Sequence, residues 1–293
     1  MAKDSCKTWS WLMAFFLGAI ALQVTAVPPA EDSMNRDRLE SLLAADDPIN
    51  EAIIIEIFRR NPDQVLMFID SYLEGGLEII ETNGSMDKAG ASFRKGIQFA
   101  NLADKAFRQN DLTRYAAGFA SWSPTEQKRF RKGQALYRQG RTAESEDKLE
   151  QAAELYERSL ELADSLNDSW GMQMALSGLA RVALEQARYK RAQELAIRAI
   201  DLSSRLHLRH AQIKSMMIAA KAREQLELPD RGVGHLRQAW KMLTPDDDID
   251  FRQQVYETYL SAAIAADRDQ EVMQLRMEAP IKPTSTEQDD SGS

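Results

Sequence analysis

Cysteine is almost absent from this sequence: the 293 residues contain one, Cys6. Because Cys6 precedes the N-terminal apolar stretch described below, it is not a lipid-attachment cysteine that follows a signal segment. After it, the chain has no thiol for a disulfide or a thiolate metal site. In an oxidising compartment, stability must therefore come from the packing of secondary structure.

Glycine and proline are also few, at 14 and 9 residues, as expected where helices dominate. A surplus of positive charge is missing, because 37 lysines and arginines stand against 45 acidic residues. Nucleic-acid-binding domains usually carry a basic surface, so the composition argues against nucleic acid as a partner. The hydrophobic fraction of 44% and the charged fraction of 28% are those of a soluble protein.

Catalytic motifs are absent as well, including Gly-rich phosphate loops, nucleophile elbows and His-Glu-x-x-His runs. His207 and His210 have a spacing that can ligate a metal, but no cysteine or repeated carboxylate joins them. We interpret them as solvated residues near a turn, and His235 as a partly buried packing residue. The sequence therefore predicts a protein that is not an enzyme, with no metal and no cofactor.

Residues 1–26 have the pattern of a signal peptide. Lys3 and Lys7 precede an apolar stretch from Trp9 to Leu22, and Val24-Thr25-Ala26 offers small residues for cleavage after Ala26. The alternative is an uncleaved N-terminal anchor, although polar residues make the stretch a poor membrane span. Either way, we expect the rest of the chain outside the cytoplasm, periplasmic or secreted, with no membrane span in the mature chain.

Four sites share one helix-start pattern, in which a capping residue precedes proline: Asp47-Pro48, Asn61-Pro62, Ser123-Pro124 and Thr244-Pro245. The first two help to divide residues 27–86 into three helices, a short one around Leu39, then 49–60 and about 63–81. The turn at Asn83-Gly84-Ser85 ends this block. We interpret it as a helical cap that covers the first face of a repeat array.

A repeat begins after the cap. Small residues recur every forty positions at Ser159, Ala199, Ala239 and Ala279, and a second series stands seven residues before them at Ala152, Ala192, Gly232 and Val272. This spacing predicts helix pairs over 87–279, about five of them, in which small residues let paired helices approach closely. Pro280 ends the last pair, and the composition of 280–293 is that of a disordered tail.

Two stretches carry a family resemblance. The run from Gly133 to Gly140, followed by Ala152, Tyr156 and Ser159, resembles the small–aromatic–small pattern of tetratricopeptide repeats, as do the residues around Leu179-Ala180 and Tyr189. The usual period of that family is about 34 residues, so the forty-residue period here implies longer helices. The resemblance implies an all-α, right-handed α-solenoid that binds other proteins, with no defined ligand.

In tetratricopeptide arrays the first helix of each pair lines a concave groove. That resemblance implies a set of groove residues that combines aromatic, methionine, polar and basic side chains: Phe130, Gln134, Tyr137, Arg138, Met174, Ser177, Arg181, Leu184, Lys214, Met217, Lys221 and Glu224. Arg138, Arg181, Lys214 and Lys221 would form a basic ladder for an extended peptide or helix of acidic character. The asparagines of the family's carboxylate clamp are missing, so its ligand is not implied.

Three alternatives stay open. The groove residues can equally be solvated charges and ordinary packing residues, and the basic run 128–132 a solvated face. The chain can also be a carrier that encloses a small ligand between the cap block and the repeats. In that case one set of apolar side chains would line its pocket: Ile53, Ile54, Ile55, Phe58, Phe68 and Tyr72.

Overall fold

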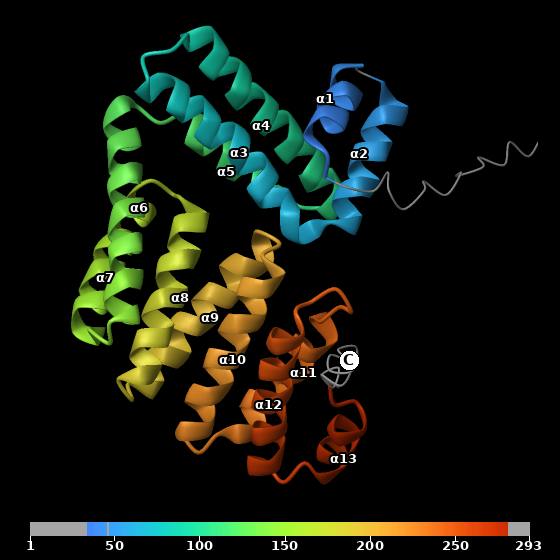
Figure 1. Cartoon of the computed structure of the whole chain (residues 1–293), viewed down its shortest axis with the longest axis vertical. Coiled ribbons are helices and arrows are strands. Elements are labelled where there is room, and N and C mark those ends of the chain that lie inside the picture. The colour runs from blue at the N-terminus through green and yellow to red at the C-terminus, as the bar shows by residue number, and fades with distance from the viewer. Residues whose placement is uncertain (1–33, 46, 281–293) are drawn as a thin grey trace, which may run out of the picture. The chain divides into compact units, whose positions relative to one another are not determined.

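The computed structural model describes residues 34–45 and 47–280, and within them the chain forms thirteen α-helices and no strand (Figure 1). The predicted all-α fold is confirmed. The proposed signal peptide and most of the tail lie outside the described residues. The helices are α1 (Arg36–Ala44), α2 (Pro48–Arg60), α3 (Pro62–Glu81), α4 (Met86–Phe107), α5 (Asp111–Ala120), α6 (Pro124–Ser145), α7 (Leu149–Ser165), α8 (Ser169–Glu185), α9 (Tyr189–Arg205), α10 (Arg209–Gln225), α11 (Pro229–Met242), α12 (Ile249–Ala265) and α13 (Asp269–Met277).

From α6 to α13 the helices pack in chain order, each against the next helix along the chain. The first helices of the pairs also contact one another, α6 with α8, α8 with α10 and α10 with α12. These first helices therefore form one continuous layer, as the solenoid-like arrangement requires.

The forty-residue period divides into two almost identical helix–turn steps of twenty residues. Left-handed backbone recurs at this interval, at Asp147, Asn167, Ala187, His207 and Glu227, and again at Asp267. After each of these residues, the next N–H donates to the carbonyl five positions before it, as in Arg188 N to Ala183 O at 2.8 Å. This pattern closes a Schellman-type C-cap, so one turn geometry links the helices of a pair and also successive pairs.

Proline marks the start of a helix at three of the four predicted sites. Asp47 caps α2, and Ser123 forms a capping box with Glu126 at the start of α6. Asn61 precedes α3, but its side-chain amide donates to Ile57 O of α2 at 2.9 Å instead of capping α3.

The prediction at Thr244-Pro245 is wrong, because these residues lie in the α11–α12 connection and Asp248 caps α12. The carboxylate of Asp247 accepts the Thr244 N–H at 2.6 Å, and this bond folds the segment into a turn. A helix start that the pattern missed is Pro229, the first residue of α11.

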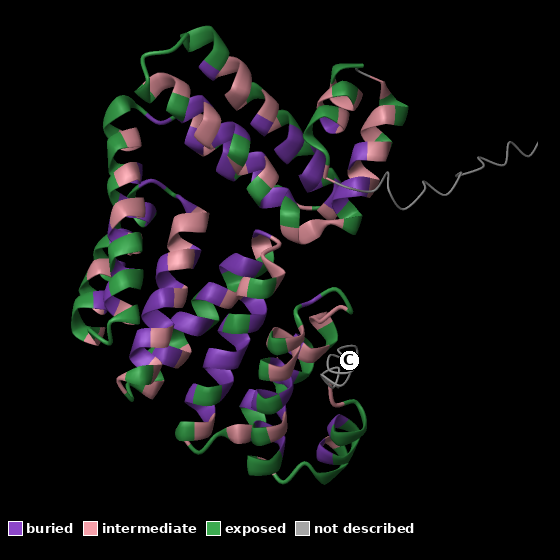
Figure 2. Ribbon diagram, in the orientation of Figure 1, coloured by how far each residue is buried: buried purple, intermediate pink, exposed green. Residues whose placement is uncertain are grey.

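The apolar residues of the cap block form a core, not the lining of a pocket. Ile54 and Phe58 are fully buried and Tyr72 is 3% exposed, while Ile53, Ile55 and Phe68 pack against the same cluster. Figure 2 shows buried residues recurring along the helices of this block. The small-residue series is also internal, with Ala152, Ala192, Ala199 and Ala239 fully buried. Ala279 is an exception, because α13 ends at Met277 and Ala279 lies beyond it.

The Tyr156 side chain of α7 packs between helices α6 and α8. Its ring is fully buried, and a Cβ atom at Gly140 of α6 or Gly178 of α8 would lie 2.8 Å or 2.7 Å from ring atoms. The phenol donates to Glu144 at 2.5 Å, and Arg181 donates to both oxygens of Glu144 at 2.7 and 2.8 Å. Gly140 and Gly178 therefore leave the space between α6 and α8 that the Tyr156 ring occupies.

Long-range contacts join the first five helices to the α9–α10 turn. The His207 ring stacks on Phe107 with centroids 3.8 Å apart, and Arg205 pairs with Asp111 at 2.9 Å. The prediction that His207 is solvated is therefore wrong. Burial lowers the pKa of this half-buried imidazole.

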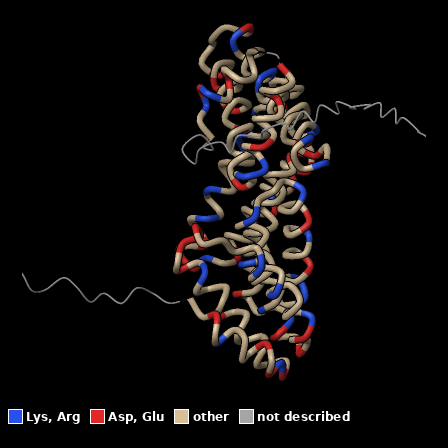
Figure 3. The backbone as a smooth tube through the Cα atoms, turned by 90° about the vertical axis from the view of Figure 1, so that its right-hand side faces the viewer, with Lys and Arg blue, Asp and Glu red and all other residues tan. Residues whose placement is uncertain are grey.

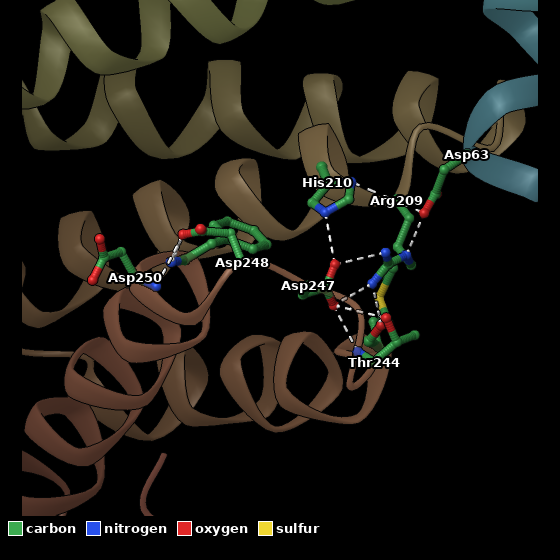
Figure 4. Close-up of polar contacts among 9 residues, drawn as sticks. Asp63, Arg209, His210, Thr244, Asp247, Asp248 and Asp250 are labelled. Carbon is green, nitrogen blue, oxygen red and sulfur yellow. Dashed lines mark hydrogen bonds and ion pairs between the residues drawn. The ribbon is translucent and has the colours of Figure 1, made fainter. Parts of the chain in front are cut away.

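Arg209 extends this junction to the C-terminal helices (Figure 4). Its guanidinium binds Asp63 at 2.6 Å and both oxygens of Asp247 at 2.7 and 2.8 Å, and His210 contacts Asp247 at 2.7 Å. Burial opposes ionisation of Asp247, whose side chain is 1% exposed, but the bonds from Arg209 hold its pKa well below the usual range. We call Asp63, Arg209, His210 and Asp247 the closing cluster, because they connect α3, α10 and the α11–α12 turn. His210 stays exposed, with 48% of its side chain accessible, as predicted, although it contacts Asp247.

Candidate functional site

A pocket of about 300 Å³ lies between α3 and α5 on one side and α6, α7 and α8 on the other. Helix α6 supplies one wall, with seven lining residues that recur on one helical face between Arg129 and Arg141. The apolar side of the pocket comes from α7, the turn after it and α8: Leu162, Ala163, Leu166, Trp170 and Met174.

Carboxylates gather where α3 reaches the pocket. Asp70 accepts the Tyr115 hydroxyl at 2.7 Å, and Glu74, one turn later, accepts from Arg131 at 2.5 Å and from Gln134 at 2.6 Å. Asp168 lies in the turn before α8, is 5% exposed and accepts the Gly171 N–H at 2.9 Å. In the described part of the chain, neither Asp70 nor Asp168 forms an ion pair.

Burial shifts the titration of both of these carboxyl groups. It raises the pKa of Asp70 to about 7, with further increases from the negative charges of Glu74 and Asp168, and raises that of Asp168 to about 6. The Tyr115 hydroxyl, buried beside them, has its pKa raised well above the usual value, first by burial and then by the charge of Asp70. Carboxylates with raised pKa in a cleft are typical of functional sites.

Arginines occupy the exposed side of the same wall. Arg129, Arg138 and Arg141 line the pocket, are exposed and form no ion pair with the described residues. Arg131 differs, because it binds Glu74 and also Glu81, at 2.7 and 2.9 Å. The basic run 128–132 is therefore a solvated face only in part, since Arg131 is paired and Phe130 is 6% exposed within the core. Figure 3 shows basic and acidic residues interspersed along the helices.

Five of the twelve predicted groove residues line this pocket: Phe130, Gln134, Tyr137, Arg138 and Met174. On α8, Ser177 contacts Gln173 at 2.9 Å, Arg181 is bound to Glu144, and Leu184 packs on the core of the array.

The candidates on α10 lie partly in the core and partly at the surface. Met217 is buried at 9% exposure, and Lys214 lies over the Phe251 ring at 5.7 Å from its centroid. Lys221 is exposed, and Glu224 accepts from Ser261 at 3.4 Å. The predicted row of free basic residues is therefore incomplete, because Arg181 is paired with the Glu144 carboxylate.

Several pocket residues were not among the candidates, above all Asp70, Glu74 and Asp168. Asp70 had a readable signal, since it occupies the same helical stripe as the buried Leu66, Leu73 and Leu77. A carboxylate inside an apolar stripe indicates a buried polar group. Asp168 had none, because a capping residue in a turn is usually exposed.

Other site chemistries have no support in residues 34–280 as described. No group of three or more potential metal ligands occurs there, and no helix there is long and apolar enough to cross a membrane. His235 contacts Arg223 at 2.7 Å and is half-buried, and its pKa is lowered by burial and by the charge of Arg223.

Comparisons with known proteins assign the chain to no family. No model of a known protein family matches the chain, and no curated protein matches it. Among solved structures, it aligns with the crystal structure of BtubC (BKLC) from P. vanneervenii at 16% identity, over 86% of this chain and 99% of that one, with a TM-score of 0.43. A TM-score this low supports no conclusion about function.

Proposed function

We propose that the chain is a non-catalytic binding protein whose pocket takes a short segment of a protein partner. The pocket carries this proposal, because its volume of about 300 Å³ combines an apolar side with unpaired charges. Pockets for small molecules span about 300–1,000 Å³, so this one accommodates a side chain or two. The resemblance to tetratricopeptide repeats supports the same function. The signal-peptide pattern of residues 1–26 supports a location outside the cytoplasm.

The chemistry of the lining favours binding over catalysis. Among the described residues that line the pocket there is no histidine, cysteine or lysine. Its one serine, Ser159, donates its hydroxyl to Gly133 O at 3.0 Å and is 3% exposed. A nucleophile needs an adjacent base, and this hydroxyl is directed at a backbone carbonyl instead.

Peptide selection against the intact chain tests the proposal. We expect displayed random peptides to enrich on the wild-type protein and to lose binding to Met174→Trp, which fills the pocket from its apolar side. Met273→Trp is the matched control, because Met273 lies on α13, is 66% exposed and does not line the pocket. Failure to enrich any peptide, or enrichment that Met174→Trp leaves unchanged, would contradict the proposal.

A second candidate function is the carriage of a small ligand. The observation in its favour is that the pocket is formed jointly by α3 of the cap block and α6–α8 of the array. Native mass spectrometry of the protein purified from its source should then show a bound small molecule. That mass should be lost in Met174→Trp and retained in Met273→Trp.

A further inference from the structure

Charge in the pocket is divided along α6. Near Gln134 lie the carboxylates, since Glu74 binds the Gln134 amide and Asp70 is one turn away on α3. Arg138 and Arg141 lie further along the same helix, four and seven residues after Gln134. At 1.5 Å of rise per residue, these positions lie about 6 and 10 Å beyond Gln134 along the helix axis. We call the two regions the acidic end and the basic end.

Carboxyl groups outnumber cations at the acidic end, where burial raises the pKa of Asp70 to about 7 and that of Asp168 to about 6, so that a cation placed there would favour their ionised forms. Its one arginine, Arg131, binds Glu74 and Glu81, whereas Asp70 and Asp168 form no ion pair with the described residues, although the charge of Arg131 does act on Asp70. Ionised carboxylates held away from water are unfavourable unless a cation or several hydrogen-bond donors compensate them. A ligand that brings an ammonium or guanidinium group would supply that compensation.

The basic end has the opposite need. Arg138 and Arg141 are exposed and form no ion pair with the described residues, although the charge of Arg141 contributes to the lowered pKa of Glu144. The remaining arginine, Arg129, belongs to the start of α6, where its charge adds to the bonds from Ser123 that lower the pKa of Glu126. A purely cationic ligand would leave the basic end unused, and a purely acidic one would be repelled by Asp70 and Asp168.

We propose that the pocket recognises a peptide segment that carries a lysine or arginine side chain and, two residues away, an acidic side chain. Residues two apart in an extended chain are separated by about 7 Å, which agrees with the separation of the two ends. The aliphatic stem of the basic side chain would lie along Leu162, Leu166 and Met174, and its charged head would bind Asp70 and Asp168. This inference rests on the proposed peptide-binding function and names the class of peptide.

Fluorescence anisotropy with defined peptide pools tests it. The probes are fluorescein-labelled, acetylated pools with random uncharged flanks around Lys-Gly-Glu, Glu-Gly-Lys, Glu-Gly-Glu or Gln-Gly-Gln. We expect one of the two mixed-charge orders to bind the intact chain at least tenfold more tightly than both Glu-Gly-Glu and Gln-Gly-Gln. The direction in which the peptide lies decides which order is preferred.

Isosteric variants assign the charges. Asp70→Asn and Asp168→Asn keep oxygen acceptors for Tyr115 and Gly171 and should fold, yet each should weaken mixed-charge binding several-fold. Arg138→Gln should abolish the preference for the acidic residue, whereas Arg158→Gln, an exposed arginine of α7 that does not line the pocket, should change nothing.

The outcomes separate the two proposals. Equal binding of the uncharged and mixed-charge pools, abolished by Met174→Trp, would overturn the charge inference and leave the peptide-binding function standing. Mixed-charge binding that both aspartate variants leave intact would also overturn the charge inference. Absence of binding by every pool, together with a failed peptide selection, would overturn the function itself.

Discussion

The glycines on either side of Tyr156 offer a sharp test of how the array is packed. Alanine normally stabilises a helix interior by about 0.5–1 kcal/mol relative to glycine. At Gly178, however, the new methyl group would lie 2.7–2.9 Å from three atoms of the Tyr156 ring. The ring cannot easily move, because it is fully buried and its hydroxyl is bound to Glu144. We therefore expect Gly178→Ala to destabilise the protein by about 1–3 kcal/mol through overpacking.

Two glycines in other helices provide matched controls. Gly118 of α5 and Gly234 of α11 have no atom within 4 Å of an added Cβ. Substitution of either by alanine should raise the free energy of unfolding by about 0.5–1 kcal/mol. Urea denaturation followed by far-UV circular dichroism measures all three variants. If Gly178→Ala stabilises the chain as Gly234→Ala does, the proposed close packing of the Tyr156 ring against Gly178 is wrong.

Three further changes test other parts of the structure. Ala187→Gly should stabilise the chain by about 0.5–1 kcal/mol in denaturant melts, because glycine adopts the left-handed backbone at φ 57° without a steric penalty; a loss of stability would contradict the turn geometry. Arg209→Leu should cost about 2–4 kcal/mol by leaving buried Asp247 without its guanidinium, and adding Asp247→Asn should recover part of the loss in a double-mutant cycle. Because the folded-state pKa of Asp70 is raised to about 7, the wild type holds a proton there that the unfolded chain releases above about pH 4. Its stability should therefore fall between about pH 4 and 7, and Asp70→Asn should reduce this slope, gaining about 1–3 kcal/mol at pH 8 relative to pH 4; an unchanged slope would contradict the burial of this carboxyl group.

The helical class and the starts of three helices could be predicted because they depend on local chemistry. Proline after a capping residue located the starts of α2, α3 and α6, and small residues at a fixed spacing identified the packing layer of the pairs. The series of small residues every forty positions predicted the period of the helix pairs, but it did not reveal the twenty-residue step from one helix to the next. Its turns use Ala187, His207 and Glu227 in left-handed backbone instead of glycine, so they have no signature in the sequence.

The pocket could be predicted only in part. Phe130, Gln134, Tyr137, Arg138 and Met174 line the pocket and were among the groove residues that the resemblance to tetratricopeptide repeats implied. The acidic residues come from α3 and from a turn, and their approach to α6 depends on tertiary packing. The Glu144 that binds Arg181 is 37 residues away in the chain, so the interruption of the basic ladder could not be read from either helix alone.

The most direct test of the account is whether a peptide enters the pocket beside Trp170. Protein labelled with 5-fluorotryptophan gives a fluorine resonance for each tryptophan, and Trp170→Phe and Trp240→Phe assign the two that matter. Trp170 lines the pocket, whereas Trp240 lies on α11 with its indole N–H donated to Glu278 at 3.0 Å. We predict that the preferred mixed-charge peptide pool shifts the Trp170 resonance in a saturable manner and leaves the Trp240 resonance unchanged. A Trp170 resonance that stays unchanged while peptide is bound would show that the binding site is elsewhere.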